Sequence, residues 1–120
     1  MKRNELEDRL VDFAVEIIGI VEALPETKAG RHIAGQLVRA GTAPAPNYGE
    51  AQGAESRNDF IHKMKIALKE LREALIWLKI VERRGMLPEA TITPVMNECQ
   101  ELVAIFVAST KTADSNRPAK

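Results

Sequence analysis

The chain has 120 residues, enough for one domain with a single core, and its 45% hydrophobic but only 4% aromatic residues are typical of aliphatic helix packing rather than of a β-sandwich. The formal net charge is zero, which excludes a general electrostatic attraction to nucleic acid or to an anionic membrane and leaves only a local patch for such a partner. A single cysteine, Cys99, excludes an internal disulfide, and the absence of a secretory signal and of a long apolar run predicts a cytoplasmic protein without membrane spans.

The first predicted helix covers residues 6–24, where apolar residues recur at steps of three and four. One stripe of this helix comprises Leu6, Leu10, Phe13, Ile17, Val21 and Leu24. Val11, Val15 and Ile18 widen the stripe, so we expect the helix to contact more than one neighbour. Pro25 ends it.

The second predicted helix begins near Thr27 and meets two prolines, Pro44 and Pro46. A proline in an ordinary helix interior removes one backbone hydrogen bond and costs about 3 kcal/mol. The helix therefore either ends near Gly41 or continues with a pronounced kink. We favour the kink, because alanines among the next residues are good helix formers and no strand pattern follows.

The third predicted helix begins at Ser56, which resembles an N-cap because an acid follows three residues later, and it ends at Gly85. Its core stripe comprises Phe60, Met64, Ala67, Leu71, Ala74, Leu78 and Val81. Another apolar set points elsewhere and comprises Ile66, Ile76, Trp77 and Ile80. A helix with apolar residues in so many directions predicts that another subunit covers part of its surface.

The start of the last predicted helix is ambiguous, because Pro88 and Pro94 would each suit a first-turn position. In one alternative the chain makes a short turn near Glu89 and the main helix begins after Thr93. Its core stripe comprises Met96, Cys99, Val103, Phe106 and Thr110. Residues 113–120 lack periodic apolar content, which predicts a disordered tail after a bundle domain of residues 1–112. Helical segments joined by short connections predict an all-α, antiparallel up-down-up-down four-helix bundle with helix two kinked at Pro44–Pro46.

Charge is unevenly distributed along the chain. Residues 1–24 carry three basic and six acidic side chains, whereas residues 54–86 carry eight basic and five acidic. In the third helix, a cationic stripe is formed by Lys65, Lys69, Arg72, Lys79 and Arg83. This stripe could neutralise phosphates and is the candidate nucleic-acid site. The alternative, which we favour, is a solvated face that Glu70 and Glu73 partly compensate, or one that docks against the acidic first helix.

A second polar set lies on both sides of the kink and comprises Gln36, Arg39, Asn47 and Glu50. Its functional interpretation is a contact with a polar ligand or with nucleic acid. Its structural interpretation is that it satisfies backbone groups freed by the prolines and pairs Arg39 with Glu50 or with another subunit. We favour the structural interpretation, because the lost backbone bonds need partners.

No pattern for catalysis or metal binding stands out. His32 and His62 have no acid or cysteine at the spacing of metal ligands. Cys99 lies on an apolar stripe and is predicted to be a core residue. Glu70 and Glu73 alone do not form an acid–base pair. We therefore predict no enzymatic activity, no metal and no cofactor.

Two segments carry a family resemblance: QLVRAGTAPAPNYGEA at 36–51 and DFIHKMKIALKELREALIWLKIVERRGML at 59–87. The chain resembles, from about Val11 to Thr112, the four-helix bundle proteins encoded within intervening sequences of bacterial 23S ribosomal RNA genes. The most specific matches are Gln36, Arg39, Asn47, Glu50, Phe60, Ile66, Ala67, Glu70, Glu73 and the turn at Gly85, Met86 and Leu87.

The resemblance implies an antiparallel four-helix bundle and a ring-shaped homopentamer with an electropositive surface. It also links the chain to the accessory variability determinant of diversity-generating retroelements, a similar bundle that assists a reverse transcriptase and contacts nucleic acid. The expected partners are therefore further copies of the chain, RNA or DNA, and a reverse transcriptase or another protein. The resemblance implies no enzymatic activity. Our functional hypothesis is a non-catalytic homo-oligomeric accessory or scaffold protein associated with nucleic acid, and the alternative is a purely protein–protein assembly module.

Overall fold

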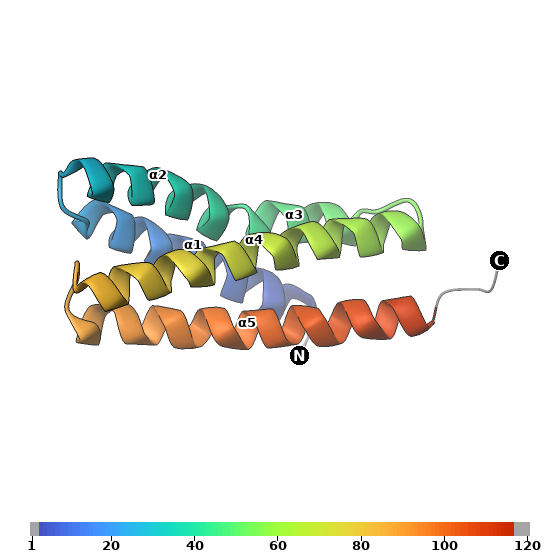
Figure 1. Ribbon diagram of the computed structural model, residues 1–120. Coiled ribbons are helices and arrows are strands. Elements are labelled where there is room, and N and C mark those ends of the chain that lie inside the picture. Colours follow the sequence, from blue (N-terminus) through green and yellow to red (C-terminus); the bar gives the residue numbers. More distant parts are fainter. Residues whose placement is uncertain (1–2, 117–120) are drawn as a thin grey trace.

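The computed structural model describes residues 3–116, with side chains from residue 5 onward, and contains five helical segments (Figure 1). They are α1 (Arg3–Ala23), α2 (Lys28–Thr42), α3 (Pro44–Gln52), α4 (Arg57–Arg84) and α5 (Glu89–Ser115). Because α2 and α3 are the halves of one bent helix, the chain forms four rods, and successive rods run in opposite directions (Figure 1). The predicted all-α, antiparallel four-helix bundle is confirmed.

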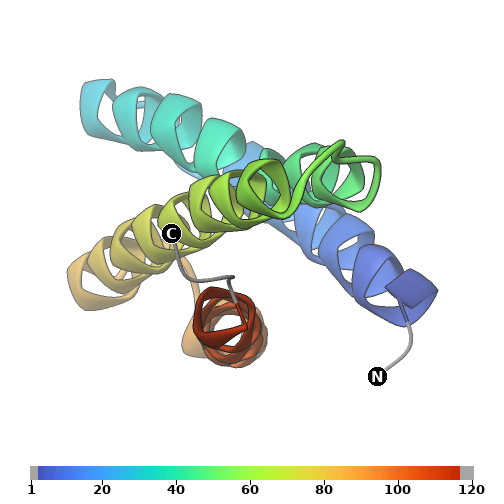
Figure 2. The ribbon, with the colours of Figure 1, turned by 90° about the vertical axis from the view of Figure 1, so that its right-hand side faces the viewer.

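Each rod packs on two neighbours. The bent rod of α2 and α3 contacts both α1 and α4, and α5 also contacts both of them. Within the described residues, no Cα atom of α1 lies within 8 Å of a Cα atom of α4. Seen along α5, α1 and α4 are inclined in different directions (Figure 2). The acidic first helix therefore does not dock against α4 in the same chain, as one interpretation of the cationic stripe required.

The kink in helix two is confirmed, and the alternative of an end near Gly41 is wrong. Ala43 has helical angles (φ −67°, ψ −32°), and its N–H donates to the Arg39 carbonyl at 3.1 Å. Its own carbonyl accepts the N–H of Asn47 at 3.1 Å, so the helical path continues through the bend. Pro44 is tolerated because it occupies the first position of α3, where a missing N–H costs least.

The other helix ends follow the local signals. Ser56 Oγ accepts the N–H of Asp59 at 3.0 Å, which confirms the predicted cap of α4. Gly85 adopts a left-handed φ of 68°, and the N–H of Met86 reaches back to the carbonyl of Val81 at 3.1 Å, as in a glycine-terminated helix. The last helix begins at Glu89, the earlier of the two predicted starts.

The C-terminal boundary needs a correction. Helix α5 continues to Ser115, so residues 113–115 are helical and do not belong to a disordered tail. Contacts with α4 explain the extension, because Lys65 Nζ lies 3.1 Å from Asp114 Oδ2 and Arg57 donates to the carbonyl of Asn116. Residues 117–120 of the predicted tail lie outside the described residues.

One continuous core fills the space between the rods. Phe13 on α1 and Phe106 on α5 are fully buried. The ring of Phe106 contacts that of Tyr48 on α3 edge to face, with centroids 6.0 Å apart. The predicted stripes are correct except at their edges, where Ile20, Ile61 and Leu102 are buried and the predicted Val21, Phe60 and Val103 are half-buried. No helix in the described part of the chain is long and apolar enough to cross a membrane.

Gly41→Ala is expected to lower the free energy of unfolding by about 1–3 kcal/mol. An added Cβ would lie 2.6 Å from Cγ2 and 2.7 Å from Cγ1 of Ile17, where α1 approaches α2. The control is Gly35→Ala in the same helix, where a Cβ would have nothing within 4 Å. There the higher helix propensity of alanine should raise stability by about 0.5–1 kcal/mol. Urea unfolding followed by circular dichroism measures both, and equal effects would contradict this close approach.

Candidate functional site

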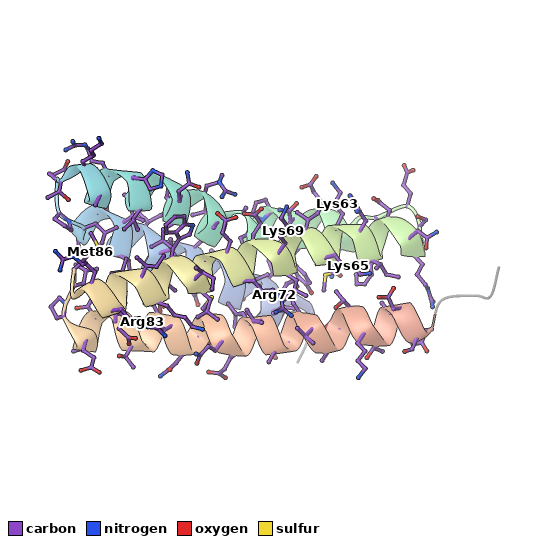
Figure 3. All side chains as sticks on the ribbon, viewed as in Figure 1. Lys63, Lys65, Lys69, Arg72, Arg83 and Met86 are labelled. Atoms are coloured by element: carbon purple, nitrogen blue, oxygen red, sulfur yellow. The ribbon has the colours of Figure 1, made fainter. Side chains whose placement is uncertain are left out.

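The cationic stripe runs along α4 beside its buried residues, on the edge where Lys65 reaches Asp114 of α5. The buried residues of this helix are Ile61, Met64, Ala67, Leu71, Ala74, Leu78 and Val81. Figure 3 labels Lys65, Lys69, Arg72 and Arg83 at successive positions along α4. These four side chains are exposed, and Lys79 is half-buried. At 1.5 Å per residue the stripe is about 27 Å long.

Only one member of the cationic stripe is neutralised within the described part of the chain. Lys65 pairs with Asp114 of α5, whereas no ion pair or side-chain hydrogen bond is formed there by Lys69, Arg72, Lys79 or Arg83. The predicted compensation by Glu70 and Glu73 is wrong, because both carboxylates face α2 and pair with Arg39. In the described part of the chain the stripe therefore has four cations without an ion-pair partner, three on exposed side chains and one, Lys79, on a half-buried side chain.

Arg39 holds α2 against α4. Its Nη1 donates to Glu70 Oε2 at 2.8 Å, and its Nη2 donates to Glu73 and, at 3.4 Å, to Gln36 Oε1. Glu73 Oε2 also accepts the indole N–H of Trp77 at 3.3 Å. Because the Arg39 side chain is 50% exposed, each of these pairs contributes little alone, and their value lies in fixing how the two helices meet.

The ring of Trp77 extends this cluster to the first half of α2. It packs edge to face against His32, with ring centroids 5.9 Å apart. His32 therefore packs against an aromatic ring. Among the described residues, no three His, Cys, Asp or Glu side chains are grouped so that they could hold a metal ion.

The polar set around the kink is divided among three separate contacts. Gln36 and Arg39 belong to the contact with α4 above the bend. Asn47 Nδ2 donates to the carbonyl of Ala43 at 3.1 Å, directly at the bend. Below it, Glu50 Oε1 lies 3.3 Å from Lys63 Nζ, so the predicted pairing of Arg39 with Glu50 is not found. These contacts hold the bent rod against α4 on both sides of its kink.

An ion pair between α1 and α5 was also missed in the sequence. Arg9 on α1 binds Glu98 on α5 through two hydrogen bonds, Nη2 to Oε1 at 2.5 Å and Nε to Oε2 at 3.0 Å. The hydrogen bond to Glu98 is the main cause of a raised pKa for Arg9. Burial, and then the negative charges of Glu98 and Asp12, raise the pKa of Glu16. In the sequence, an arginine among the acidic residues of the first helix indicates such a pair. This pattern does not identify the acid that the arginine binds.

Cys99 is a core residue, as predicted, and its thiol donates to the carbonyl of Leu71 at 3.3 Å. Burial, with a smaller contribution from Glu98, raises its pKa to about 12. Because its pKa is raised, the Cys99 thiol keeps its proton in the folded state. The contribution of the buried, protonated thiol to stability is present below the ordinary pKa of 9.0 and is lost as the pH rises toward 12.

We therefore expect Cys99 to react with iodoacetamide near pH 8 only after unfolding, because the thiolate is the nucleophile. Mass spectrometry of the alkylated protein over time should show a rate that rises steeply with added urea. A native rate equal to that of the unfolded chain would contradict the burial of this side chain.

Comparison with known proteins decides the family. Residues 2–108 match the model of the 23S rRNA-intervening sequence protein. The chain belongs to the 23S rRNA-intervening sequence protein family. A crystal structure of a protein of unknown function from the S23 ribosomal protein family of Bacteroides thetaiotaomicron is 32% identical, with a TM-score of 0.84, over 92% of this chain and 99% of that one. No curated protein matches the chain.

Membership of the 23S rRNA-intervening sequence protein family confirms the resemblance seen in the sequence. The structure shows what four of the most specific positions do in this chain. Gln36 and Arg39 of α2 meet Glu70 and Glu73 of α4 in one cluster between the two helices. Glu73 also accepts the indole N–H of Trp77, whereas Lys69, Arg72, Lys79 and Arg83 of the cationic stripe form no ion pair in the described part of the chain.

Proposed function

We propose that this protein is a non-catalytic, self-associating helical bundle that binds RNA or DNA through the cationic stripe of α4 and acts in the cytoplasm as an accessory or scaffold protein. The observation that carries the proposal is the set of four cations without a partner in the described part of the chain. Cations that neutralise phosphates release the counterions condensed on the nucleic acid, and this release favours binding.

The shape of the surface supports a nucleic-acid backbone as the ligand. The row of four cations from Lys69 to Arg83 is about 21 Å long and can follow several phosphates of one strand, whereas a small anion would need donors that converge. No aromatic side chain belongs to the stripe, so the contacts would be to phosphates and would not select a base sequence. Binding that does not depend on the base sequence suits an accessory protein that associates with exposed nucleic acid.

Self-association is supported by apolar side chains that the core leaves in water. Ile76 and Ile80 lie beside the cations of α4 and are 54% and 39% exposed. The family resemblance extends this to a ring of five copies, and to a reverse transcriptase or another nucleic-acid enzyme as the protein that is assisted.

The salt dependence of binding tests this function. With a fluorescent single-stranded RNA, four phosphate contacts should give a slope of about −3 when the logarithm of the association constant is plotted against that of the salt concentration. Affinity should accordingly fall by about fiftyfold between roughly 50 and 200 mM salt. Fluorescence anisotropy measures it. No binding at the lowest salt would leave the runner-up, a protein–protein assembly module, as the better description.

A further inference from the structure

Exposed apolar side chains gather on two outward faces of the bundle. The α1 outward face consists of Val11, Val15 and Ile18, which are 46%, 62% and 42% exposed, with Asp8 and Glu22 at its ends. The α4 outward face consists of the cationic stripe together with Ile76 and Ile80. Of the large hydrophobic residues in the described part of the chain that are exposed, only Val107 lies elsewhere.

The two faces are complementary in charge and in spacing. Asp8 and Glu22 are fourteen residues apart on α1, and Lys69 and Arg83 are fourteen residues apart on α4, which is about 21 Å in each helix. Midway between the acids lies Val15, and midway between the cations lies Ile76. Placed against each other in either direction, the faces bring an apolar centre between two pairs of opposite charges.

These faces cannot meet within one chain. α1 and α4 occupy diagonal positions in the bundle and have no Cα atoms within 8 Å of each other. The two helices are inclined in different directions (Figure 2). A contact between them requires two copies, each of which offers one face and leaves the other free, so repetition of the contact builds a ring or a filament.

We propose that the α1 outward face of one copy docks on the α4 outward face of a second copy, where its acids take the place of phosphates. The inference rests on the self-association and nucleic-acid binding proposed above and adds their relation. Because both contacts use the same cations, an RNA strand and a neighbouring copy compete for the α4 outward face. Nucleic acid therefore opens the assembly, and assembly protects the cations from non-specific anions.

Charge reversal in two complementary variants tests the contact. Asp8→Lys/Glu22→Lys makes the α1 outward face basic, and Lys69→Glu/Arg83→Glu gives the α4 outward face two acids. Each variant alone should sediment as a monomer under conditions in which the natural chain assembles. An equimolar mixture of the two should associate again, because each face then meets an opposite charge. Restoration in the mixture also shows that both variants are folded.

The control is Glu26→Lys/Glu55→Lys, which makes the same change of charge at exposed positions outside the α1 outward face and should assemble as the natural chain does. Either of two results would overturn the contact: assembly of Asp8→Lys/Glu22→Lys like the natural chain, or a mixture that stays monomeric although circular dichroism shows both variants to be helical. A natural chain that is monomeric at micromolar concentration would overturn it as well.

A neutral variant separates this inference from the proposed function. Val15→Gln removes the apolar centre of the α1 outward face without changing the charge, so it should weaken assembly and strengthen RNA binding relative to the assembled natural chain. If assembly weakens while neither protein binds RNA, the proposed function fails and the contact stands. If RNA binds both proteins equally and leaves the assembly intact, the competition is wrong and the nucleic-acid function stands.

Discussion

Lys69→Glu/Arg72→Glu/Lys79→Glu is expected to lower the affinity for single-stranded RNA by about a thousandfold at low salt. Each lost hydrogen bond between a cation and a phosphate is worth about 1.5 kcal/mol, and three of them give a little over three powers of ten. The slope of affinity against salt should fall from about −3 to near zero, since one cation of the four remains among three repelling acids. Fluorescence anisotropy across a salt series measures both quantities.

The matched control is Lys28→Glu/Arg31→Glu/Lys111→Glu, which gives the same net charge with substitutions on α2 and α5, away from the cationic stripe. It should bind RNA with nearly the affinity and slope of the natural chain. Five of the six substituted side chains are exposed and Lys79 is half-buried. Exposed substitutions usually change stability by less than about 0.5 kcal/mol each, so circular dichroism should show both variants folded. Equal losses in the two variants would mean that overall charge, and not the stripe, governs binding.

Phe106→Ala is expected to lower the free energy of unfolding by about 3–5 kcal/mol. The Phe106 ring, on α5, is completely buried in the core. It contacts the ring of Tyr48 on α3 edge to face, with ring centroids 6.0 Å apart. Its loss leaves a cavity in the core, where the Phe106 ring meets the Tyr48 ring across the bundle. We therefore expect hydrogen exchange to accelerate first in α3, which is a short helix held by few core residues.

Phe60→Ala is the control for this second prediction. It removes the same side chain from a half-buried position near the start of α4, so we expect a loss of only about 1 kcal/mol. Urea unfolding of the two variants gives the comparison. Similar losses would contradict the location of the core between α3 and α5.

The sequence alone predicted the features that depend on a single helical turn. Ser56 as a cap, Gly85 as a terminator and the bend at Pro44 act through backbone groups within a few residues, so their effect is fixed before any helix packs. Periodicity predicted the core for the same reason, and it failed only at stripe edges such as Ile20 and Val21, where a small rotation of the helix decides which side chain turns inward.

The pairing of charges between helices could not be predicted in this way. Arg39 had Glu50 as a plausible partner along its own chain, and it binds Glu70 and Glu73 because of the rotation of α2 relative to α4. The Arg9–Glu98 pair depends equally on the neighbour that α1 has in the bundle. The absence of α1 from the surface of the cationic stripe is a third consequence of packing. Helices α1 and α4 lie diagonally across the bundle, so the acidic residues of α1 do not pack against α4.

The family assignment does not by itself define a biochemical role, because a genomic location is not a mechanism. The structure instead separates the residues that hold the helices together from those that lie at the surface. The residues that gave the strongest resemblance hold the bent rod in place, and the cations beside them are directed to solvent. One side of α4 thus packs in the core and carries Glu70 and Glu73 toward α2, and the cationic stripe lies along another side.

Lysine acetylation with and without RNA tests most directly whether the cationic stripe is the binding surface. In dilute natural protein, mass spectrometry would follow the rate at which each lysine reacts. We expect RNA to slow acetylation of Lys69 and Lys79 and to leave Lys28 and Lys111, which are exposed elsewhere, unchanged. Unchanged rates at Lys69 and Lys79 in the presence of bound RNA would contradict the proposed interface.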